Sequence, residues 1–184
     1  MPRRSTRLFE WLLLAMVIGI VLMGAVALYG RMAGDVQRLS FELAAQNFQT
    51  AVSGVRAEWY IRRSRGEAMT ESVLYSELPG LAGREAKGDT VVYLNEEGWP
   101  ANTENRQLAQ DGRQTLEECL QLWQALLQEP PRATLSEEPE PEAVYQVRLG
   151  EDGQCRYRHL YDAEGRQYFD YWPATGRVSS YTPQ

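Results

Sequence analysis

The chain has 184 residues, which is enough for one domain of ordinary size and too few for two full ones. It carries 19 Lys+Arg against 25 Asp+Glu, and a formal net charge of −6 argues against broad nucleic-acid binding. One histidine and two cysteines leave almost no material for a multi-ligand zinc site or a Cys-His nucleophile. The informative feature is the uneven distribution of the apolar residues.

The N-terminal region predicts a basic leader followed by a transmembrane helix. Residues 1–10 contain Arg3, Arg4 and Arg7, and the run 11–29 has no charged residue. At about 1.5 Å per residue this run reaches roughly 28 Å, close to the ~30 Å thickness of the hydrocarbon core. Positive charge before the first span favours a cytoplasmic N-terminus, which places the rest of the chain across the membrane.

Two export signals are alternatives to a retained anchor. Ala25-Val26-Ala27 is an A-x-A triplet suited to signal peptidase, although the apolar run is longer than the usual ~7–15 residues of such signals. The pair Arg3-Arg4 is typical of twin-arginine export, but polar residues follow it directly. We therefore favour the anchor.

Residues 30–65 predict an amphipathic continuation of the same helix. We expect one helix from about Leu8 to Arg63, because no proline interrupts it and arginines before Gly66 suit a helix end. The expected apolar stripe steps by three to five residues and consists of Val36, Leu39, Leu43, Phe48, Val52, Val55 and Trp59, with Ala44 and Ala51 beside it. Such a stripe requires a partner surface.

Residues 66–184 predict an α+β domain across the membrane that covers this stripe. Residues 66–90 are expected to form a loop, and 90–94 a strand that Trp99-Pro100 ends. Thr115 with Glu118 fits a capping box for a helix that Pro130-Pro131 stops. A solvated linker at 136–142 then precedes four short strands between 144 and 181, which predict an antiparallel meander. The predicted fold class is thus α+β: a long helix packed on a small antiparallel sheet with one extra helix.

Cys119 and Cys155 both follow the predicted span. An even number of cysteines in an oxidising compartment is most simply a disulfide, and two buried free thiols are the alternative. Closing this loop would contribute about 3.8 kcal/mol by the chain-entropy estimate. The pair has no C-x-x-C spacing, so a redox role is not indicated.

No motif for catalysis, a cofactor or a metal emerges, so we expect a non-enzymatic protein with no catalytic, cofactor-binding or metal-binding residues. His159 is expected to be a surface or cross-strand packing residue. The aromatic residues of 145–181 are expected to form the core and rim of the sheet, and a sugar-binding face is the alternative. Glu10 is unusual because a carboxylate at the start of a span is costly; it either lies at the headgroups beside Arg7 or has a purpose.

The arrangement resembles the type IV pilin-like family, whose members join a basic leader, an apolar helix with a glutamate, an amphipathic continuation and a sheet domain. Leu8-Phe9-Glu10-Trp11-Leu12 matches the segment around the family's glutamate, and the same register places Gly19 and Tyr29 on its mid-helix glycine and its tyrosine. The closing Asp170 to Val178 resembles the family's D-x-x-T-G-x-V hairpins. Ser5 stands where the family's leader ends in glycine, and Ala27 replaces the proline that kinks the helix.

Further points of contact are with proteins of MSHA (mannose-sensitive haemagglutinin) pilus biogenesis. They are Gly98-Trp99-Pro100, the segment from Cys119 to Pro130, and Cys155-x-Tyr157. The resemblance implies a single-pass protein of the bacterial inner membrane with a periplasmic C-terminal domain, which enters a pilus or supports its assembly. Its partners would be pilins or pilus-assembly proteins and membrane lipid, with no nucleic acid and no small-molecule substrate.

The resemblance also implies roles for individual residues. Leu12 to Leu28 would form the face that bundles with other helices, Glu10 would guide docking together with Gly19 and Tyr29, and Cys119–Cys155 would brace the exported domain. The alternative is a membrane-anchored periplasmic binding or sensory module for a glycan or a protein. A scaffold of the division or secretion apparatus would have a similar sequence.

Overall fold

The computed structural model describes residues 3–66, 72–74, 91–105, 109, 114–138, 140–161 and 166–182. Within helix or strand, the side chains of 3–8, 31–35 and 72–74 are outside the description. The chain divides into two compact units, Met1–Ser40 and Phe41–Gln184, and each is described by itself. We call the second unit the head.

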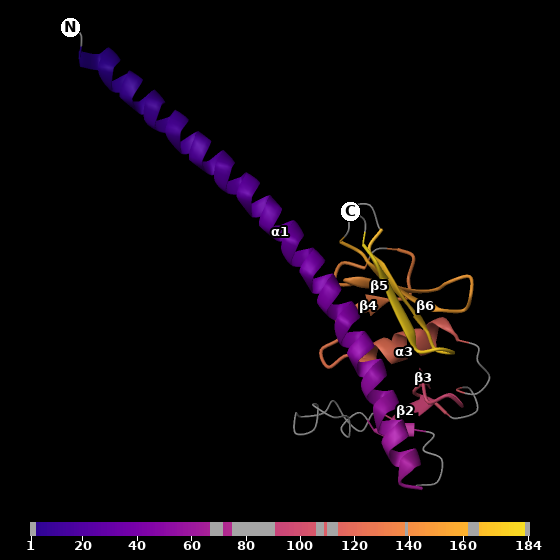
Figure 1. The fold of residues 1–184 in the computed structure, drawn as a ribbon. Coiled ribbons are helices and arrows are strands. Elements are labelled where there is room, and N and C mark those ends of the chain that lie inside the picture. Colours follow the sequence, from indigo (N-terminus) through magenta and orange to yellow (C-terminus); the bar gives the residue numbers. More distant parts are fainter. Residues whose placement is uncertain are drawn as a thin grey trace. The chain divides into compact units, whose positions relative to one another are not determined.

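Helix α1 (Arg3–Ser64) is the longest element and contributes to both units (Figure 1). It confirms the predicted uninterrupted helix and adds one turn at the N-terminal end. Its last turn contains Arg62 and Arg63, whose positive charges oppose the partial negative charge of a helix C-terminus. Gly66 then adopts a φ of +72°, and its N–H donates to the carbonyl of Arg63 at 3.2 Å, which closes the helix.

The buried face of α1 begins later than the sequence predicted. Its buried residues are Phe41, Ala44, Ala45, Phe48, Val52, Val55 and Trp59. In contrast, Val36, Leu39 and Leu43 are 64%, 56% and 48% exposed, so their assignment to the core stripe was wrong. The prediction failed because this stretch of the helix contains two groups of apolar residues, one exposed and one buried. A spacing of three to five residues does not distinguish between them.

The larger sheet has five strands in the order β4-β5-β6-β7-β8. Strands β5 (Tyr145–Leu149), β6 (Cys155–His159), β7 (Tyr168–Trp172) and β8 (Arg177–Tyr181) form the predicted antiparallel meander. Gly153 and Gly176 adopt φ values of +74° and +68° in two of its turns, as tight hairpins require. The turn expected at 163–165 lies outside the described residues. Strand β4 (Ala133–Thr134) pairs in parallel with β5 and was not predicted.

A second, three-stranded antiparallel sheet has the order β1-β2-β3. Strand β1 (Ser72–Leu74) lies within the segment predicted as a loop, and β2 (Val91–Leu94) confirms the one strand expected here. Strand β3 (Pro100–Asn102) begins at the proline that was expected to end the strand region. The error has a physical reason, because a proline is accommodated at the first residue of an edge strand.

Helix α3 (Leu116–Leu126) confirms the predicted capping box. The Glu118 backbone N–H donates to the Thr115 hydroxyl at 3.2 Å, and the Thr115 N–H donates to the Glu118 carboxylate at 2.8 Å. The helix ends before Pro130, because Leu127 is extended. The indole N–H of Trp123 donates to the carbonyl of Pro131 at 2.9 Å, which holds the proline segment against the helix.

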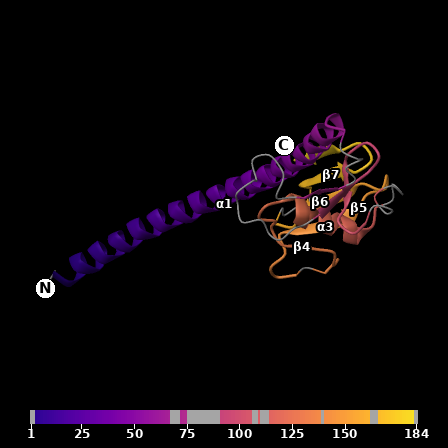
Figure 2. The same cartoon turned by 90° about the horizontal axis from the view of Figure 1, so that it is seen from below.

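The core of the head lies between the five-stranded sheet, α3 and the part of α1 from Phe41 onward. Figures 1 and 2 show both helices beside the sheet. The ring of Phe48 lies 5.2 Å from that of Tyr157 and 5.4 Å from that of Tyr171, and Trp123 lies 4.6 Å from Tyr145. Both helices therefore contact the same face of the sheet, and the fold class is α+β, as predicted.

Candidate functional site

The first candidate site is the apolar part of α1. Residues Phe9–Gly30 are long and apolar enough to cross a membrane, and none of them is buried in the fold. The residues expected to act in assembly all lie on this segment. Glu10 and Tyr29 are exposed near its two ends, and a side chain added at Gly19 would meet no atom within 4 Å.

The structure does not bring these three residues together within one chain. Glu10 and Gly19 are nine residues apart on α1, so at 3.6 residues per turn they lie on opposite sides of it, about 14 Å apart along the axis. Tyr29 is 76% exposed and lies ten residues further on. Glu10 and Gly19 therefore cannot contact the same partner helix, and the three residues form no pocket within one chain.

The second candidate feature is the disulfide between Cys119 of α3 and Cys155 of β6, which confirms the predicted pairing. Both cysteines are fully buried, and their Cα atoms are 5.4 Å apart. The hydroxyl of Tyr157 donates to the carbonyl of Cys119 at 2.8 Å, so a hydrogen bond joins the same two elements. Together they fix α3 to the middle of the sheet.

His159 is a packing residue. It is 2% exposed and pairs across the strands with Tyr145. Its ring lies 5.3 Å from that of Tyr145 and 6.1 Å from that of Phe41. Of the two expectations, cross-strand packing and not a surface position is confirmed.

Three tyrosines of the sheet belong to the core. Tyr145, Tyr157 and Tyr171 are fully buried, and burial raises the pKa of each phenol above its usual value because the charged form loses its water. The hydroxyl of Tyr171 donates to the carbonyl of Pro100 at 2.6 Å. These rings are not available to stack on a sugar. Tyr168 and Tyr181 stack with their ring centres 5.3 Å apart and remain at least partly exposed.

The sequence analysis missed a contact centred on Trp99. The guanidinium of Arg56 lies 3.5 Å from the centre of a Trp99 ring, and the same indole covers Gly176, where an added Cβ would lie 2.0 Å from it. In the same way Trp59 covers Gly98, which has a φ of +83°. These contacts join α1, the β2–β3 turn and the β7–β8 turn.

Asn95 fixes the turn that carries Trp99. Its side-chain oxygen accepts from the backbone N–H of Glu97 at 3.1 Å and of Trp99 at 2.8 Å, and its amide donates to the carbonyl of Pro173 at 2.9 Å. The motif Gly98-Trp99-Pro100 is therefore a connection between parts of the head. The glycines that leave room for the two indoles, Gly98 and Gly176, are the sequence signal that could have located this contact.

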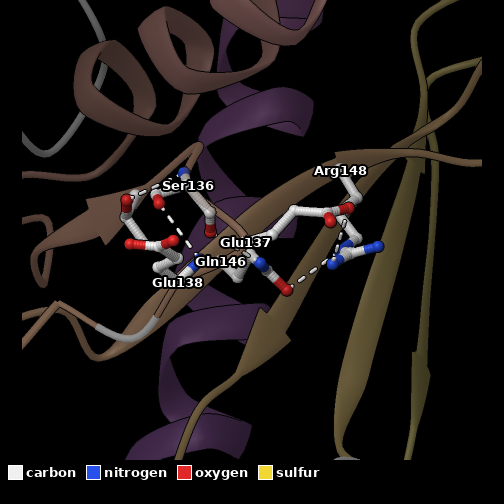
Figure 3. Close-up of polar contacts among 6 residues, drawn as sticks. Ser136, Glu137, Glu138, Gln146 and Arg148 are labelled. Carbon is white, nitrogen blue, oxygen red and sulfur yellow. Dashed lines mark hydrogen bonds and ion pairs between the residues drawn. The ribbon is translucent and has the colours of Figure 1, made fainter.

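The segment expected to be a solvated linker is tied to the sheet. The amide of Gln146 donates to the carbonyl of Ser136 at 2.7 Å, and Arg148 lies 3.4 Å from the Glu137 carboxylate, as Figure 3 shows. Arg148 also donates to the Gln146 side-chain oxygen at 2.9 Å. These side-chain contacts hold the segment that follows β4 against β5.

Described residues of the head line two hollows in its surface. One, of about 250 Å³, includes Glu96, Glu97, Asp152 and Trp172 in its lining, and the other, of about 400 Å³, includes Arg132 and Glu140. Within the part of the chain that the structure describes, no three His, Cys, Asp or Glu side chains gather as a metal site.

Comparison with known proteins adds no assignment, since no family model, curated protein or solved structure matches this chain.

Proposed function

We propose that this protein is a non-enzymatic component of type IV pilus biogenesis of the MSHA type, either a minor pilin-like subunit or part of the assembly platform. Its sequence resembles that of the MSHA pilus biogenesis protein MshF. In this proposal it is a single-pass protein of the bacterial inner membrane. Its N-terminus is cytoplasmic and its head is periplasmic.

The observation that carries the proposal is the continuity of α1. One helix provides an exposed apolar segment, Phe9–Gly30, and then contributes Phe41, Phe48 and Val52 to the core of a folded head. A helix of this kind can bind other helices through its first part while its second part presents a folded surface. Assembly needs these two properties and does not need a reaction.

Glu10 gives the assembly proposal a specific chemical element. A carboxylate at the edge of an apolar helix bundle is costly unless it meets a positive charge or a hydrogen-bond donor. A partner that supplies such a group gains affinity in one register along the helix and not in others. Glu10 therefore sets the docking register of the apolar segment, with Gly19 and Tyr29 at fixed distances from it.

A disulfide between α3 and β6 supports the location across the membrane. Such bonds persist in oxidising compartments, of which the bacterial periplasm is one. The basic leader before the apolar segment favours the same orientation. The alternative of an anchored binding module rests on the stacked pair Tyr168–Tyr181, which is partly exposed, and on the acidic hollow near Trp172.

The test is the replacement of Glu10 by alanine and by glutamine in the cell that makes the pilus. We expect Glu10→Ala to insert in the membrane normally and to reduce the number of pili at least several-fold, with partial retention in Glu10→Gln. Glu129→Ala, which removes an exposed carboxylate of the head, is the matched control. Pili in normal number on Glu10→Ala cells would contradict the role of Glu10.

Cross-linking in intact membranes separates assembly from the alternative. Contacts to pilin subunits through residues 11–29 support assembly. Contacts only through the face that carries Tyr168 and Tyr181 would support a receptor instead. The intact mass of the protein from membranes shows whether residues 1–5 or 1–27 have been removed.

A further inference from the structure

A second apolar stripe follows α1 beyond the apolar segment. Val36, Leu39 and Leu43 are 64%, 56% and 48% exposed and are separated by three and four residues. In the sequence, Tyr29 and Met32 continue the same alternation toward the N-terminus. We call these five positions the seam. An alternation of three and four gives an average of 3.5 residues, which is the repeat of a two-stranded left-handed coiled coil.

The seam is distinct from the face of the helix that the head covers. Leu43 is about half exposed, whereas its neighbours Phe41, Ala44 and Ala45 are buried in the head. The fold of the head therefore does not require the seam to be apolar. Three large apolar side chains on consecutive turns in water are costly, and such an exposed patch marks a contact with another molecule.

In the sequence, the charged residues of this stretch recur at helical spacing. Arg31, Asp35, Arg38 and Glu42 are separated by four, three and four residues, and each carboxylate lies four residues after an arginine. When the seam residues are placed at heptad positions a and d, Asp35 and Glu42 both fall at position g, on one side of the seam. Uncharged Ser40 and Asn47 flank it on the other side.

We propose that the seam pairs two copies of this chain as a short parallel coiled coil next to the membrane. The inference rests on the proposed function, because copies anchored through Phe9–Gly30 in one orientation hold the same residues at the same height. A two-fold axis then places each seam residue against its counterpart, so one stripe serves both partners.

The charges beside the seam favour a second copy of this chain as the partner and a parallel orientation of the two helices. In a parallel pair each flank meets the opposite flank of the partner, so Asp35 and Glu42 face uncharged residues. In an antiparallel pair the carboxylates would face one another. The seam also continues into the apolar segment through Ala25, Leu22 and Ile18, which keep the alternation of three and four.

The contact outside the membrane is small. Two heptads bury far less than the ~1,200 Å² of a stable interface, so pairing depends on the membrane segment as well. This predicts dimers in membranes and dissociation when the anchors are diluted into excess detergent.

The experiment uses single cysteine variants of the full chain in native membranes. Val36→Cys, Leu39→Cys and Leu43→Cys are compared with Gln37→Cys, which is exposed but lies off the seam. Oxidation is expected to give at least ten-fold more disulfide-linked homodimer at the seam positions than at position 37. The native Cys119–Cys155 bond is intramolecular and gives no dimer. Equal yields at all positions, no dimer, or cross-links only to a different protein would overturn the proposal.

A second variant guards against effects on folding. Leu39→Gln in the Val36→Cys background is expected to lower the dimer yield several-fold while the native disulfide still forms, and an unchanged yield would contradict the seam. The experiments distinguish failure of the seam from failure of the proposed function. Dimers in cells whose pili do not respond to Glu10→Ala would sustain the seam and contradict the role of Glu10 in assembly. Loss of pili with Glu10→Ala but no homodimer would do the opposite.

Discussion

The two parts of α1 both carry many apolar side chains, but these side chains have opposite environments. From Phe9 to Gly30 the side chains are apolar, and none is buried in the fold. From Phe41 to Trp59 the apolar side chains recur at helical spacing, and the head covers them. A continuous apolar surface suits lipid or a helix bundle, whereas a single stripe suits one folded partner. The pattern of apolar residues, more than their number, decides what a helix contacts.

Among the changes considered, alkaline pH should produce the largest difference in stability between the head and the apolar part of α1. The pKa values of Tyr145, Tyr157 and Tyr171 are raised in the folded head, so each phenol keeps its proton when the unfolded chain loses it near pH 10. Their contribution to stability is complete below pH 10 and declines above it, by about 1.4 kcal/mol per pH unit for each tyrosine. We expect the head to unfold between about pH 10 and 12. Near-ultraviolet circular dichroism of the detergent-solubilised protein follows the head, and a loss of signal below pH 9 would contradict this.

Phe48→Ala should be the most damaging single substitution of α1. The side chain is fully buried among Trp123, Tyr157 and Tyr171, and its loss leaves a cavity that costs about 3–5 kcal/mol of the free energy of unfolding. Leu43→Ala is the matched control on the same helix and should change this free energy by less than about 0.5 kcal/mol. Denaturant titration measures both, and equal losses would refute the two-sided description of α1.

Removal of the disulfide should weaken the head by up to about 4 kcal/mol, since the unfolded chain regains the freedom of the closed loop. The double variant Cys119→Ser/Cys155→Ser tests this without leaving a free thiol. The helix content of Phe9–Gly30 in detergent should not change, because none of these residues is buried in the fold that the disulfide stabilises. A head that unfolds at the same denaturant concentration with and without the bond would contradict the bracing role.

The smallest effect concerns the end of α1. Gly98→Ala places a Cβ 2.4 Å from Trp59 at a φ of +83°, whereas Gly153→Ala meets no atom within 4 Å at a φ of +74°. In both variants the alanine must adopt a positive φ, which costs about 1–2 kcal/mol because its Cβ approaches the backbone. Only Gly98→Ala must also displace an indole. Thermal unfolding should therefore occur at a temperature several degrees lower for Gly98→Ala than for Gly153→Ala. The reverse order would show that Trp59 does not depend on this close approach.

Local signals in the sequence predicted much of the fold. The capping box at Thr115, the absence of proline in α1 and the turn residues between β5 and β8 each determine structure over a few residues. Strand β4 was missed because two residues carry no detectable pattern, and β4 exists through its pairing with β5. The Trp99 contact depends on residues from three distant parts of the chain, which spacing cannot reveal.

The features of the candidate site also differ in how far the sequence could predict them. The pairing of Cys119 with Cys155 followed from the cysteine count and the expected compartment, and the structure contains it. The positions of Glu10, Gly19 and Tyr29 came from a resemblance, and their roles remain predictions because they concern partner chains. The onset of the buried face at Phe41 could not be derived, since it depends on where the sheet lies against the helix.

The contact between Phe48 and Tyr171 has a consequence for the order of synthesis. These residues are more than 120 positions apart in the sequence, and Gly176, which Trp99 covers, comes later still. The part of α1 from Phe41 onward is therefore synthesised long before the strands that cover its apolar face. The head can be complete only after the last hairpin has been synthesised, because Tyr171 and Gly176 contribute contacts to it. During that interval this apolar face has none of its long-range partners within the chain.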